Sequence, residues 1–151
     1  MIIRKYTHHD LDSVAILEKR AFDVGPYSKR YLRQILEDKD STSIVSQIDA
    51  RIVGYAVAIP MDRKKIDIES IAVDPDYSGM GIGHSMMASI ESISLFRKYF
   101  TIVLEVREKN VKAISFYKSL GFKETEFIEN YYSEIYCGSR NAFRMEKQID
   151  Q

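Results

Sequence analysis

The chain has 151 residues, 45% of them apolar and 29% charged, which is typical of a soluble globular protein and excludes the disordered and collagen-like classes. Lysine plus arginine and aspartate plus glutamate each number 22, so no overall field draws the protein to nucleic acid or to an anionic membrane surface. The longest apolar runs, such as residues 55–59, are far shorter than the roughly 20 residues that span a bilayer, and we expect one cytoplasmic domain over residues 1–151.

The first part of the chain predicts a strand followed by two helices. Residues 2–6 form a β-rich run, and apolar residues then recur at helical spacing over about 9–22. Pro26 holds the residue before it out of helical geometry and separates this helix from the next. Ser28 can cap the second helix, which carries Tyr31.

The rest of the chain predicts a sheet interrupted by two more helices. Residues 43–48 and 51–59 favour a hairpin. Residues 66–73 begin with alternation and end in an apolar run, the pattern of a central strand whose last part is buried on both faces. The segments expected after it are a helix over 80–98, a strand over 100–106, a helix over 110–120 that Gly121 stops, and strands near 122–129 and 140–147.

The loop after the strand at 66–73 has the composition of a phosphate-binding turn. Gly79, Gly81 and Gly83 occupy alternate positions between a strand and a helix. Because they lack Cβ atoms, the backbone can turn successive N–H groups toward one point, and the next helix adds its own unpaired N–H groups. The alternative is a tight turn without a ligand. A P-loop would need Gly-Lys-Ser/Thr, which is absent, and a Rossmann fingerprint would lie in a first βαβ unit, whereas this loop lies mid-chain.

Two segments resemble the GNAT superfamily of acetyltransferases. Residues 78–83 resemble its Arg/Gln-x-x-Gly-x-Gly/Ala signature, with Ser78 in place of the arginine or glutamine. Residues 110–122 resemble its Asn-x-x-Ala-x-x-Phe/Leu-Tyr-x-x-x-Gly-Phe segment. With residues 71–75, 104–107 and 130–132 added, the chain looks most like the N-terminal acetyltransferases of the ribosomal-protein-alanine (RimI) type. The resemblance implies a single-domain α/β (α+β) fold with a mixed central sheet of about six to seven strands flanked by about four helices.

The same resemblance implies acetyl-CoA as co-substrate and no metal. The pyrophosphate is expected in the glycine loop, the pantetheine arm along the backbone of the strand before it, and the reactive end near the helix at 110–120. The backbone N–H of Val73 is expected to polarise the thioester carbonyl. The expected cofactor contacts are Ile71, Ala72, Val73, Ser78, Gly79, Met80, Gly81, Ile82, Gly83, His84, Asn110 and Tyr117.

Tyr117 is the expected general acid. Acetyl transfer from a thioester to an amine needs a neutral amine, a polarised carbonyl and a proton for the departing thiolate. Tyr117 follows Asn110 by seven positions, two helical turns, which places both on one helix face. In the family this tyrosine protonates the CoA sulfur, and the asparagine contacts the pantetheine arm. The alternatives are a core aromatic beside Phe116 for Tyr117 and a simple helix cap for Asn110.

Three carboxylates are candidates for the base. Glu105 lies in an otherwise apolar strand, where burial would raise its pKa toward a useful range, and the resemblance places it at the position proposed as base in the alanine-acetylating enzymes. A structural ion pair is the alternative for Glu105. Glu69 and Asp67 lie on the strand where other superfamily members keep their base, and we rank them second and third. An α-amino group has a pKa near 8 against about 10.4 for lysine, so it is the easier amine to deprotonate.

Two loops carry the expected substrate contacts. In the family, the peptide groove lies between the turn at residues 23–31 and the loop at 131–139, which is rich in Tyr, Ser and Gly here. This makes Tyr31, Tyr131 and Tyr132 the substrate candidates. The alternative is that these aromatic side chains only cover the sheet.

Histidine and cysteine positions indicate no metal site. His8, His9, His84 and Cys137 lack the spacing of metal ligands, and one cysteine allows no internal disulfide. We expect all four to be structural or surface residues.

The expected activity is acetylation of the α-amino group of a protein or peptide N-terminus, from a ribosomal or other nascent chain, by direct attack in a ternary complex. A small-amine (polyamine-like) acetyltransferase is an alternative that Glu126, Glu129 and Glu134 keep open. A non-catalytic acetyl-CoA-binding module is another, against which the retention of both Glu105 and Tyr117 argues. Nucleic acid and membrane are not expected partners, and the choice between monomer and dimer is open.

Overall fold

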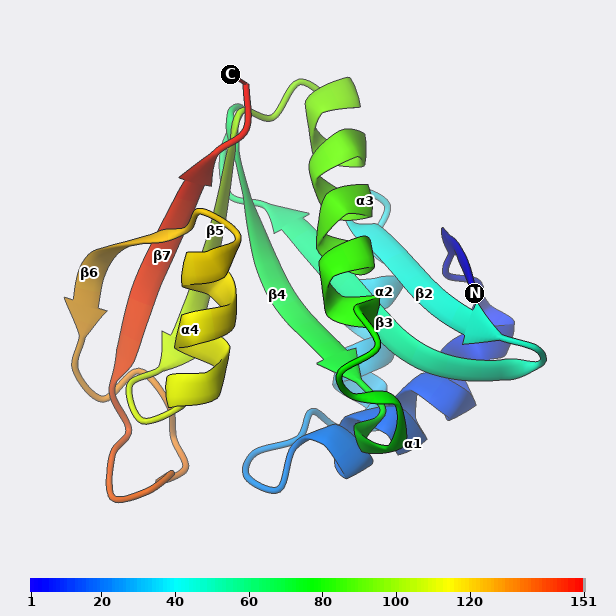
Figure 1. The fold of residues 1–151 in the computed structure, drawn as a ribbon, viewed down its shortest axis with the longest axis horizontal. Helices are drawn as coiled ribbons and strands as arrows, with labels where there is room; N and C mark the ends of the chain where they lie inside the picture. Colours follow the sequence, from blue (N-terminus) through cyan, green and yellow to red (C-terminus); the bar gives the residue numbers. More distant parts are fainter. Residues whose placement is uncertain (151) are drawn as a thin grey trace.

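The structure, a computed structural model, describes residues 1–150 and contains in that range a seven-stranded sheet and four α-helices (Figure 1). The strands are β1 (Ile2–Lys5), β2 (Thr42–Ile48), β3 (Arg51–Pro60), β4 (Lys65–Val73), β5 (Thr101–Arg107), β6 (Lys123–Ile128) and β7 (Ala142–Gln148). The helices are α1 (Leu11–Ala21), α2 (Lys29–Leu36), α3 (Ile82–Phe96) and α4 (Val111–Ser119), with 3-10 turns at His8–Asp10 and Pro75–Tyr77. The predicted mixed α/β fold is confirmed.

The sheet has the strand order β1-β2-β3-β4-β5-β7-β6, and β4 with β5 is its parallel pair. This pair follows from the crossover through α3, since parallel neighbours need a connection long enough to return along the sheet. β4 and β5 pair only from Lys65 to Ile68 and from Thr101 to Leu104. Beyond these residues the two strands diverge, as Figure 1 shows. The divergence opens the middle of the sheet at the carboxyl ends of β4 and β5.

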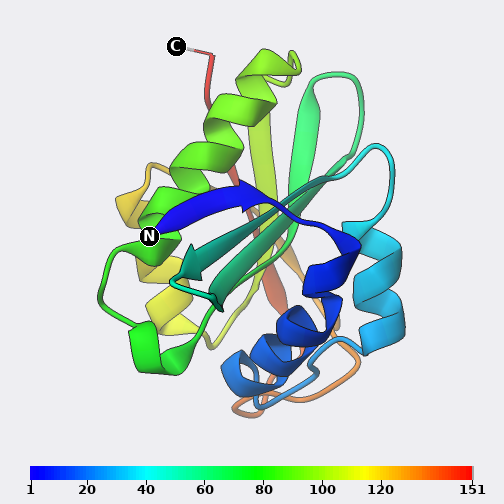
Figure 2. The same cartoon turned by 90° about the vertical axis from the view of Figure 1, so that its right-hand side faces the viewer.

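Two layers of helices enclose the sheet (Figure 2). α1 and α2 pack on one face around Leu17 and Leu32, and α3 packs on the other around Met86. Side chains of β3 alternate between the layers, with Tyr55 in the α1–α2 core and Ala56 in the α3 core. Helices therefore cover both faces of the sheet, with α1 and α2 on one face and α3 on the other.

β4 carries a β-bulge at Glu69. Val57 of β3 pairs with Ser70, and the next residue of β3, Ala58, pairs with Ile68, so Glu69 has no partner on β3. A bulge places one extra residue on its strand and re-aims the side chains that follow it. The alternation of β4 side chains between the two faces of the sheet is therefore interrupted where β4 separates from β5.

The prediction that the end of this strand is buried on both faces is wrong. Ile68 and Ala72 are buried, whereas Ile71 and Val73 are only partly buried. Ile71 and Val73 pack at the border of the α3 core, and Ala72 belongs to the α1–α2 core. The reason is the divergence of the sheet, because β5 no longer lies beside β4 after Ile68 and Leu104.

Candidate functional site

The glycine loop presents a run of free backbone N–H groups. Gly79 and Gly81 have φ of 78° and 79°, and an added Cβ would meet no atom within 4 Å at either position. Glycine is thus required there by backbone conformation rather than by space. Within residues 1–150, no protein group accepts a hydrogen bond from the backbone N–H groups of residues 79–84. Such a cradle at a helix N-terminus fits a pyrophosphate.

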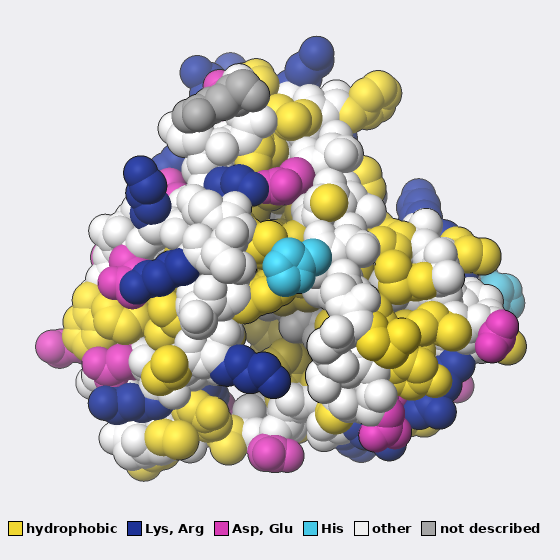
Figure 3. Space-filling view, in the orientation of Figure 1, with side chains coloured by type: hydrophobic (Ala, Val, Ile, Leu, Met, Phe, Trp, Pro, Cys, Tyr) yellow, Lys and Arg dark blue, Asp and Glu magenta, His cyan; other side chains and the backbone are white. Residues whose placement is uncertain are grey.

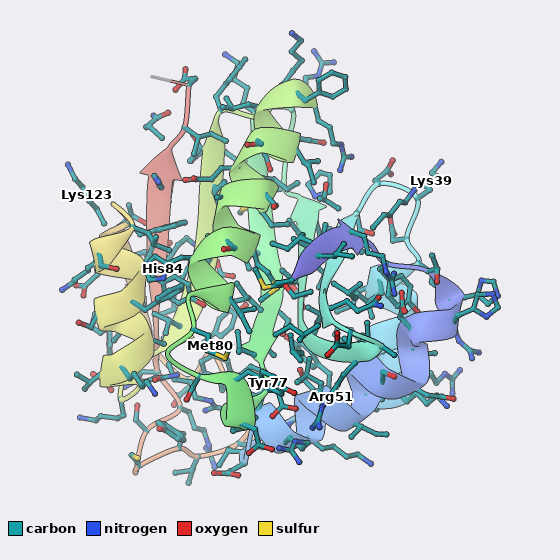
Figure 4. The ribbon with its side chains drawn as sticks, turned by 45° about the vertical axis from the view of Figure 1, so that its right-hand side comes forward. Lys39, Arg51, Tyr77, Met80, His84 and Lys123 are labelled. Atoms are coloured by element: carbon teal, nitrogen blue, oxygen red, sulfur yellow. The ribbon has the colours of Figure 1, made fainter. Side chains whose placement is uncertain are left out.

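Asp74 anchors the chain just before this loop. Asp74 is 2% exposed, and its carboxylate accepts hydrogen bonds from Arg20 at 3.0 Å, from Arg51 at 3.1 Å and from the backbone N–H of Asp76 at 2.9 Å. The Arg51 guanidinium also lies 5.5 Å from the centre of the Tyr77 ring (Figure 4). These contacts fix the turn that leads into the glycines.

Helix α4 packs directly against the start of α3. A Cβ at Gly83 would lie 3.2 Å from Cζ of Phe116, and the His84 ring stands edge-on to the Phe116 ring at 5.0 Å. Figure 4 shows His84 on the side of α3 that faces α4, with Met80 in the loop below. Figure 3 shows the surface hollowed between these two helices. Asn110 caps α4 by accepting a hydrogen bond from the backbone N–H of Ala113 at 3.2 Å.

Tyr117 lies in an aromatic cluster but keeps its hydroxyl free. Its ring meets Phe116 at 5.3 Å and Phe122 at 5.8 Å, both in edge-to-face geometry. Within residues 1–150, no protein group forms a hydrogen bond with the Tyr117 hydroxyl, and its oxygen is not fully enclosed. Burial raises the pKa of Tyr117 to about 12, so the hydroxyl is protonated at neutral pH. The residue is both a packing aromatic and an available proton donor.

Asp67, Glu69 and Glu105 come together where β4 and β5 separate. Arg144 of β7 donates from Nε to Glu105 at 2.9 Å and from Nη1 to Glu126 at 2.8 Å. The ion pair that was the alternative for Glu105 therefore exists. Burial, followed by the interaction with Glu105 and the neighbouring negative charges, raises the pKa of Asp67 to about 9.

Two tyrosines from the start of α2 and the turn before it reach Glu69. Tyr31 donates to the Glu69 carboxylate at 2.7 Å, and Tyr27 donates to the same oxygen at 3.2 Å. Burial and this hydrogen bond raise the pKa of Tyr31 to about 12. The buried Glu18 holds the turn by accepting a hydrogen bond from the backbone N–H of Tyr27 at 2.9 Å. The predicted substrate residue Tyr31 thus contacts a predicted catalytic carboxylate.

Tyr131 lies in the loop between β6 and β7, beside Tyr132. The two rings meet edge-on at 4.9 Å, and Tyr131 is 46% exposed. Partial burial raises the pKa of Tyr131 to about 12, and the charges of Glu105, Asp67 and Glu69 add to the shift. Tyr131 is therefore electrostatically coupled to the three carboxylates.

Tyr132 packs against Arg107 at the end of β5. Burial raises the pKa of Tyr132, the charge of Tyr131 adds to the increase, the charge of Arg107 opposes it, and Glu105 and Tyr117 contribute smaller increases. The Arg107 guanidinium lies 3.9 Å from the centre of the Tyr132 ring and donates to the carbonyl oxygen of Glu134 at 3.0 Å. Arg107 therefore holds this loop against the end of β5.

The predicted site residues fall into two adjoining groups. One group holds the glycine loop, Asn110 and Tyr117 around the start of α3. The other holds the carboxylates and the substrate candidates. The second group consists of Asp67, Glu69, Glu105, Tyr31, Tyr131 and Tyr132. The roles of these residues stay predictions.

Three further residues of the site were missed by sequence reasoning. Tyr27 precedes Tyr31 by one helical turn within the turn already singled out, so this spacing was a usable signal. Arg107 follows Glu105 on the same strand at the two-residue period. Arg144 is paired across β5 and β7, and no local pattern indicates such a partner.

The histidines and the cysteine stay outside the carboxylate cluster. His8, His9, His84 and Cys137 are exposed. No group of three or more histidine, cysteine, aspartate or glutamate side chains in residues 1–150 has an arrangement that could hold a metal ion. Over the same residues, every helix is too short or too polar to cross a bilayer.

Comparison with known proteins identifies relatives over almost the whole chain. The model of the Acetyltransferase (GNAT) family matches residues 10–122. An uncharacterised N-acetyltransferase of Methanocaldococcus jannaschii is 34% identical over 140 residues, which cover 89% of this chain and 85% of the relative. The N-alpha-acetyltransferase of Sulfurisphaera tokodaii is 28% identical over 144 residues, covering 87% and 86%. The crystal structure of the Escherichia coli ribosomal-protein-S18-alanine N-acetyltransferase superposes with a TM-score of 0.89 at 27% identity, covering 99% and 94%.

Proposed function

Because the chain belongs to the Acetyltransferase (GNAT) family and is an N-acetyltransferase, we propose that it transfers acetyl from acetyl-CoA to the α-amino group of a protein or peptide N-terminus. The observation that carries this proposal is the set of half-buried carboxylates at the separation of β4 and β5, where Tyr27 and Tyr31 bond Glu69 and Arg144 bonds Glu105. The relatives named for N-alpha and ribosomal-protein-alanine acetylation support an N-terminus, ribosomal or nascent, as the substrate.

The cofactor would lie along the opening between β4 and β5. Acetyl-CoA supplies the activated acetyl group as a thioester. The free N–H groups of residues 79–84 suit its pyrophosphate. The N–H groups of Ala72 and Asp74 point toward the same side of β4, where Asp74 bonds the Val53 carbonyl at 2.8 Å. Ile71 and Val73 then direct theirs into the opening, which suits the pantetheine arm and the thioester carbonyl.

The acceptor amine would enter from the side of the carboxylates, so that both substrates are bound at once. Glu105, and after it Glu69, would receive the proton of the amine, whereas Asp67, the third candidate, already holds a proton at neutral pH. Tyr31, Tyr131 and Tyr132 would line the groove. Tyr117 then protonates the departing thiolate. Its pKa of about 12 keeps the proton in place until a thiolate forms beside it.

A small-amine activity is the second candidate, because three carboxylates do meet in this site. However, the negative charge of these carboxylates is largely neutralised by groups of the protein itself. Arg144 pairs with Glu105, Asp67 holds a proton at neutral pH, and two tyrosines bond Glu69. A polyamine needs several free negative charges, so the geometry favours a monoamine such as a chain terminus.

Release of free thiol from acetyl-CoA tests the proposal. The assay would compare peptides that differ in their first two residues, the same peptides with blocked N-termini, and spermidine. We expect turnover with at least one free peptide and none with its blocked form. Turnover with spermidine alone would replace the proposal by the small-amine activity, and cofactor binding without any turnover would indicate a binding module.

A further inference from the structure

Glu18, on the last turn of α1, is a buried carboxylate to which the proposed reaction gives no part. It is 2% exposed, and each of its two oxygens accepts one hydrogen bond. Oε2 accepts from the backbone N–H of Tyr27 at 2.9 Å, in the turn after α1. Oε1 accepts from the hydroxyl of Tyr55, on β3, at 2.5 Å. A buried carboxylate is costly unless both oxygens are bonded, so Glu18 ties this turn to the sheet.

The two bonds of Glu18 lead to the two sides of Glu69. On one side, the Tyr27 hydroxyl donates to Oε1 of Glu69 at 3.2 Å. On the other side, the hydroxyls of Tyr55 and Ser70 are hydrogen-bonded at 2.8 Å, and Ser70 follows Glu69 on β4. The contacts form a closed set, the Glu18 network, which includes the β-bulge. Its members are Glu18, Tyr27, Glu69, Ser70 and Tyr55.

The network orients the carboxylate of Glu69. Tyr31 donates to the same Oε1 as Tyr27, at 2.7 Å, and the two aromatic rings lie 4.7 Å apart. Within residues 1–150, no protein group donates a hydrogen bond to Oε2 of Glu69. One oxygen of Glu69 is therefore held by the tyrosines, and the other is available to an acceptor amine.

We propose that Glu18 is a positioning residue of the acetyl transfer, which fixes the place of Glu69 in the acceptor site through Tyr27. The inference rests on the proposed function and adds a residue that contacts neither the acceptor nor acetyl-CoA. The reach of the side chain decides this role, since Glu18 must bond the turn and the sheet at the same time. A carboxylate that served folding alone would change stability and leave the acceptor kinetics as they are.

Two conservative variants separate reach from charge. Glu18→Gln keeps the length of the side chain, so its carbonyl oxygen can accept from Tyr27 and its amide N–H can bond the Tyr55 oxygen. Glu18→Asp keeps the charge but is shorter by a methylene group, and it cannot bond both partners. The assay is thiol release with a peptide that the wild-type protein accepts.

We expect Glu18→Gln to keep most of the wild-type kcat/KM for the peptide. Glu18→Asp should lose about 10²-fold, since a displacement of roughly 1 Å in a site can cost that much. The KM for acetyl-CoA should stay at the wild-type value in both variants, because the Glu18 network does not include the glycine loop.

A double-mutant cycle tests whether Glu18 acts through Tyr27. Tyr27→Phe removes the hydroxyl that bonds Glu69. If the proposal holds, the double variant with Glu18→Asp loses little more kcat/KM than the more damaging single variant. Losses that multiply in full would overturn the route through Tyr27.

Hydrogen exchange measures the position of the turn without turnover. The backbone N–H of Tyr27 lies outside the helices and strands, so its protection depends on Glu18. We expect slow exchange of this N–H in the wild type and in Glu18→Gln, and fast exchange in Glu18→Asp. Equal protection in all three proteins would contradict the proposal.

Asp10→Asn is the matched control. Asp10 is a buried carboxylate just before the other end of α1, where it accepts from Arg4 at 2.8 Å and from the backbone N–H of Thr7 at 2.9 Å. Its loss should lower the midpoint of chemical denaturation and leave kcat/KM for the peptide unchanged.

The outcomes distinguish failure of this inference from failure of the proposed function. A larger loss in Glu18→Gln than in Glu18→Asp, or losses no greater than in Asp10→Asn, would overturn the positioning role and leave the acetyltransferase proposal intact. A loss of about 10²-fold in folded Glu18→Gln would do so by itself, whether or not Glu18→Asp folds. Turnover of spermidine but of no peptide would overturn the proposed N-terminal substrate instead, and the same variants, assayed with spermidine, would still test the positioning role.

Discussion

At the scale of single residues, the Tyr117 hydroxyl is set apart by what surrounds it. Its ring is held by Phe116 and Phe122, while no group within residues 1–150 bonds its oxygen. A tyrosine used only for packing gains little from such a hydroxyl, since buried polar groups usually have partners. This arrangement suits a hydroxyl group that donates its proton to a bound ligand.

Tyr117→Phe tests this role. The ring contacts remain, so we expect folding and acetyl-CoA affinity close to those of the wild type. Loss of the acid should lower kcat by about 10²-fold or more. Steady-state kinetics and cofactor titration measure the two quantities. Equal losses in kcat and in cofactor affinity would show that Tyr117 serves packing alone.

Residue identity was more predictable than residue pairing. Glu105, Glu69, Tyr31 and Tyr131 could be named because the resemblance to the GNAT acetyltransferases points to their segments, and each has a side chain that suits the expected role. The proton on Asp67 could not be predicted, because it depends on which residues of β5 lie beside β4. Likewise, Glu105 and Arg144 lie 39 positions apart and meet only through the pairing of β5 with β7.

At the scale of elements, the loop between β4 and α3 owes its shape to backbone conformation. Gly81 begins α3 with φ of 79°, in the left-handed region that other residues enter only with strain. Gly138, in the β6–β7 loop, has the same φ of 79° and equally open surroundings. The two glycines thus share backbone conformation and open surroundings, although Gly81 caps α3 and Gly138 lies in the turn between Tyr136 and Ser139.

Gly81→Val and Gly138→Val therefore form a matched pair. Each should cost about 1–2 kcal/mol in the free energy of unfolding, because the side chain has space but the backbone is strained. Only Gly81→Val should abolish acetyl-CoA binding. Chemical denaturation and calorimetric titration would show this. A similar loss of cofactor affinity in Gly138→Val would contradict the assignment of the loop.

Element positions could be predicted well because each begins or ends at a local signal. Ser28 caps α2 by accepting from the backbone N–H of Tyr31, and Asn110 caps α4, both as their sequences indicate. The bulge at Glu69 could not be predicted, since the apolar run that follows it equally fits a strand buried on both faces. Only the pairing with β3 reveals the extra residue.

At the scale of the whole molecule, the titration of Asp67 makes the free energy of unfolding depend on pH. The raised pKa of Asp67 means that the folded protein holds a proton which the unfolded chain loses above about pH 4. The contribution of Asp67 to the free energy of unfolding is therefore greatest below about pH 4, and it declines as the pH rises toward 9. At neutral pH, folding must therefore bind a proton at Asp67, and this lowers the free energy of unfolding.

Asp67→Asn should remove that decline. The amide stays neutral at every pH and has nearly the same size as the carboxyl group. We expect the variant to melt at a higher temperature than the wild type at pH 8–9, by roughly 2–4 °C or more for each kcal/mol regained, with the difference vanishing near pH 4. Thermal melts across this range would measure it. A constant difference at all pH values would rule out a titrating Asp67.

The extra residue at Glu69 is one that the pairing of β3 with β4 does not require. Without it, Ile68 would stay opposite Ala58 and Ser70 opposite Val57, so the ladder would become regular with its present partners. Ile71 and Val73 would keep the face that they have now. What deletion would remove is the carboxylate that Tyr27 and Tyr31 bond. A chain shortened by this one residue is therefore expected to keep its sheet and to lose part of the site.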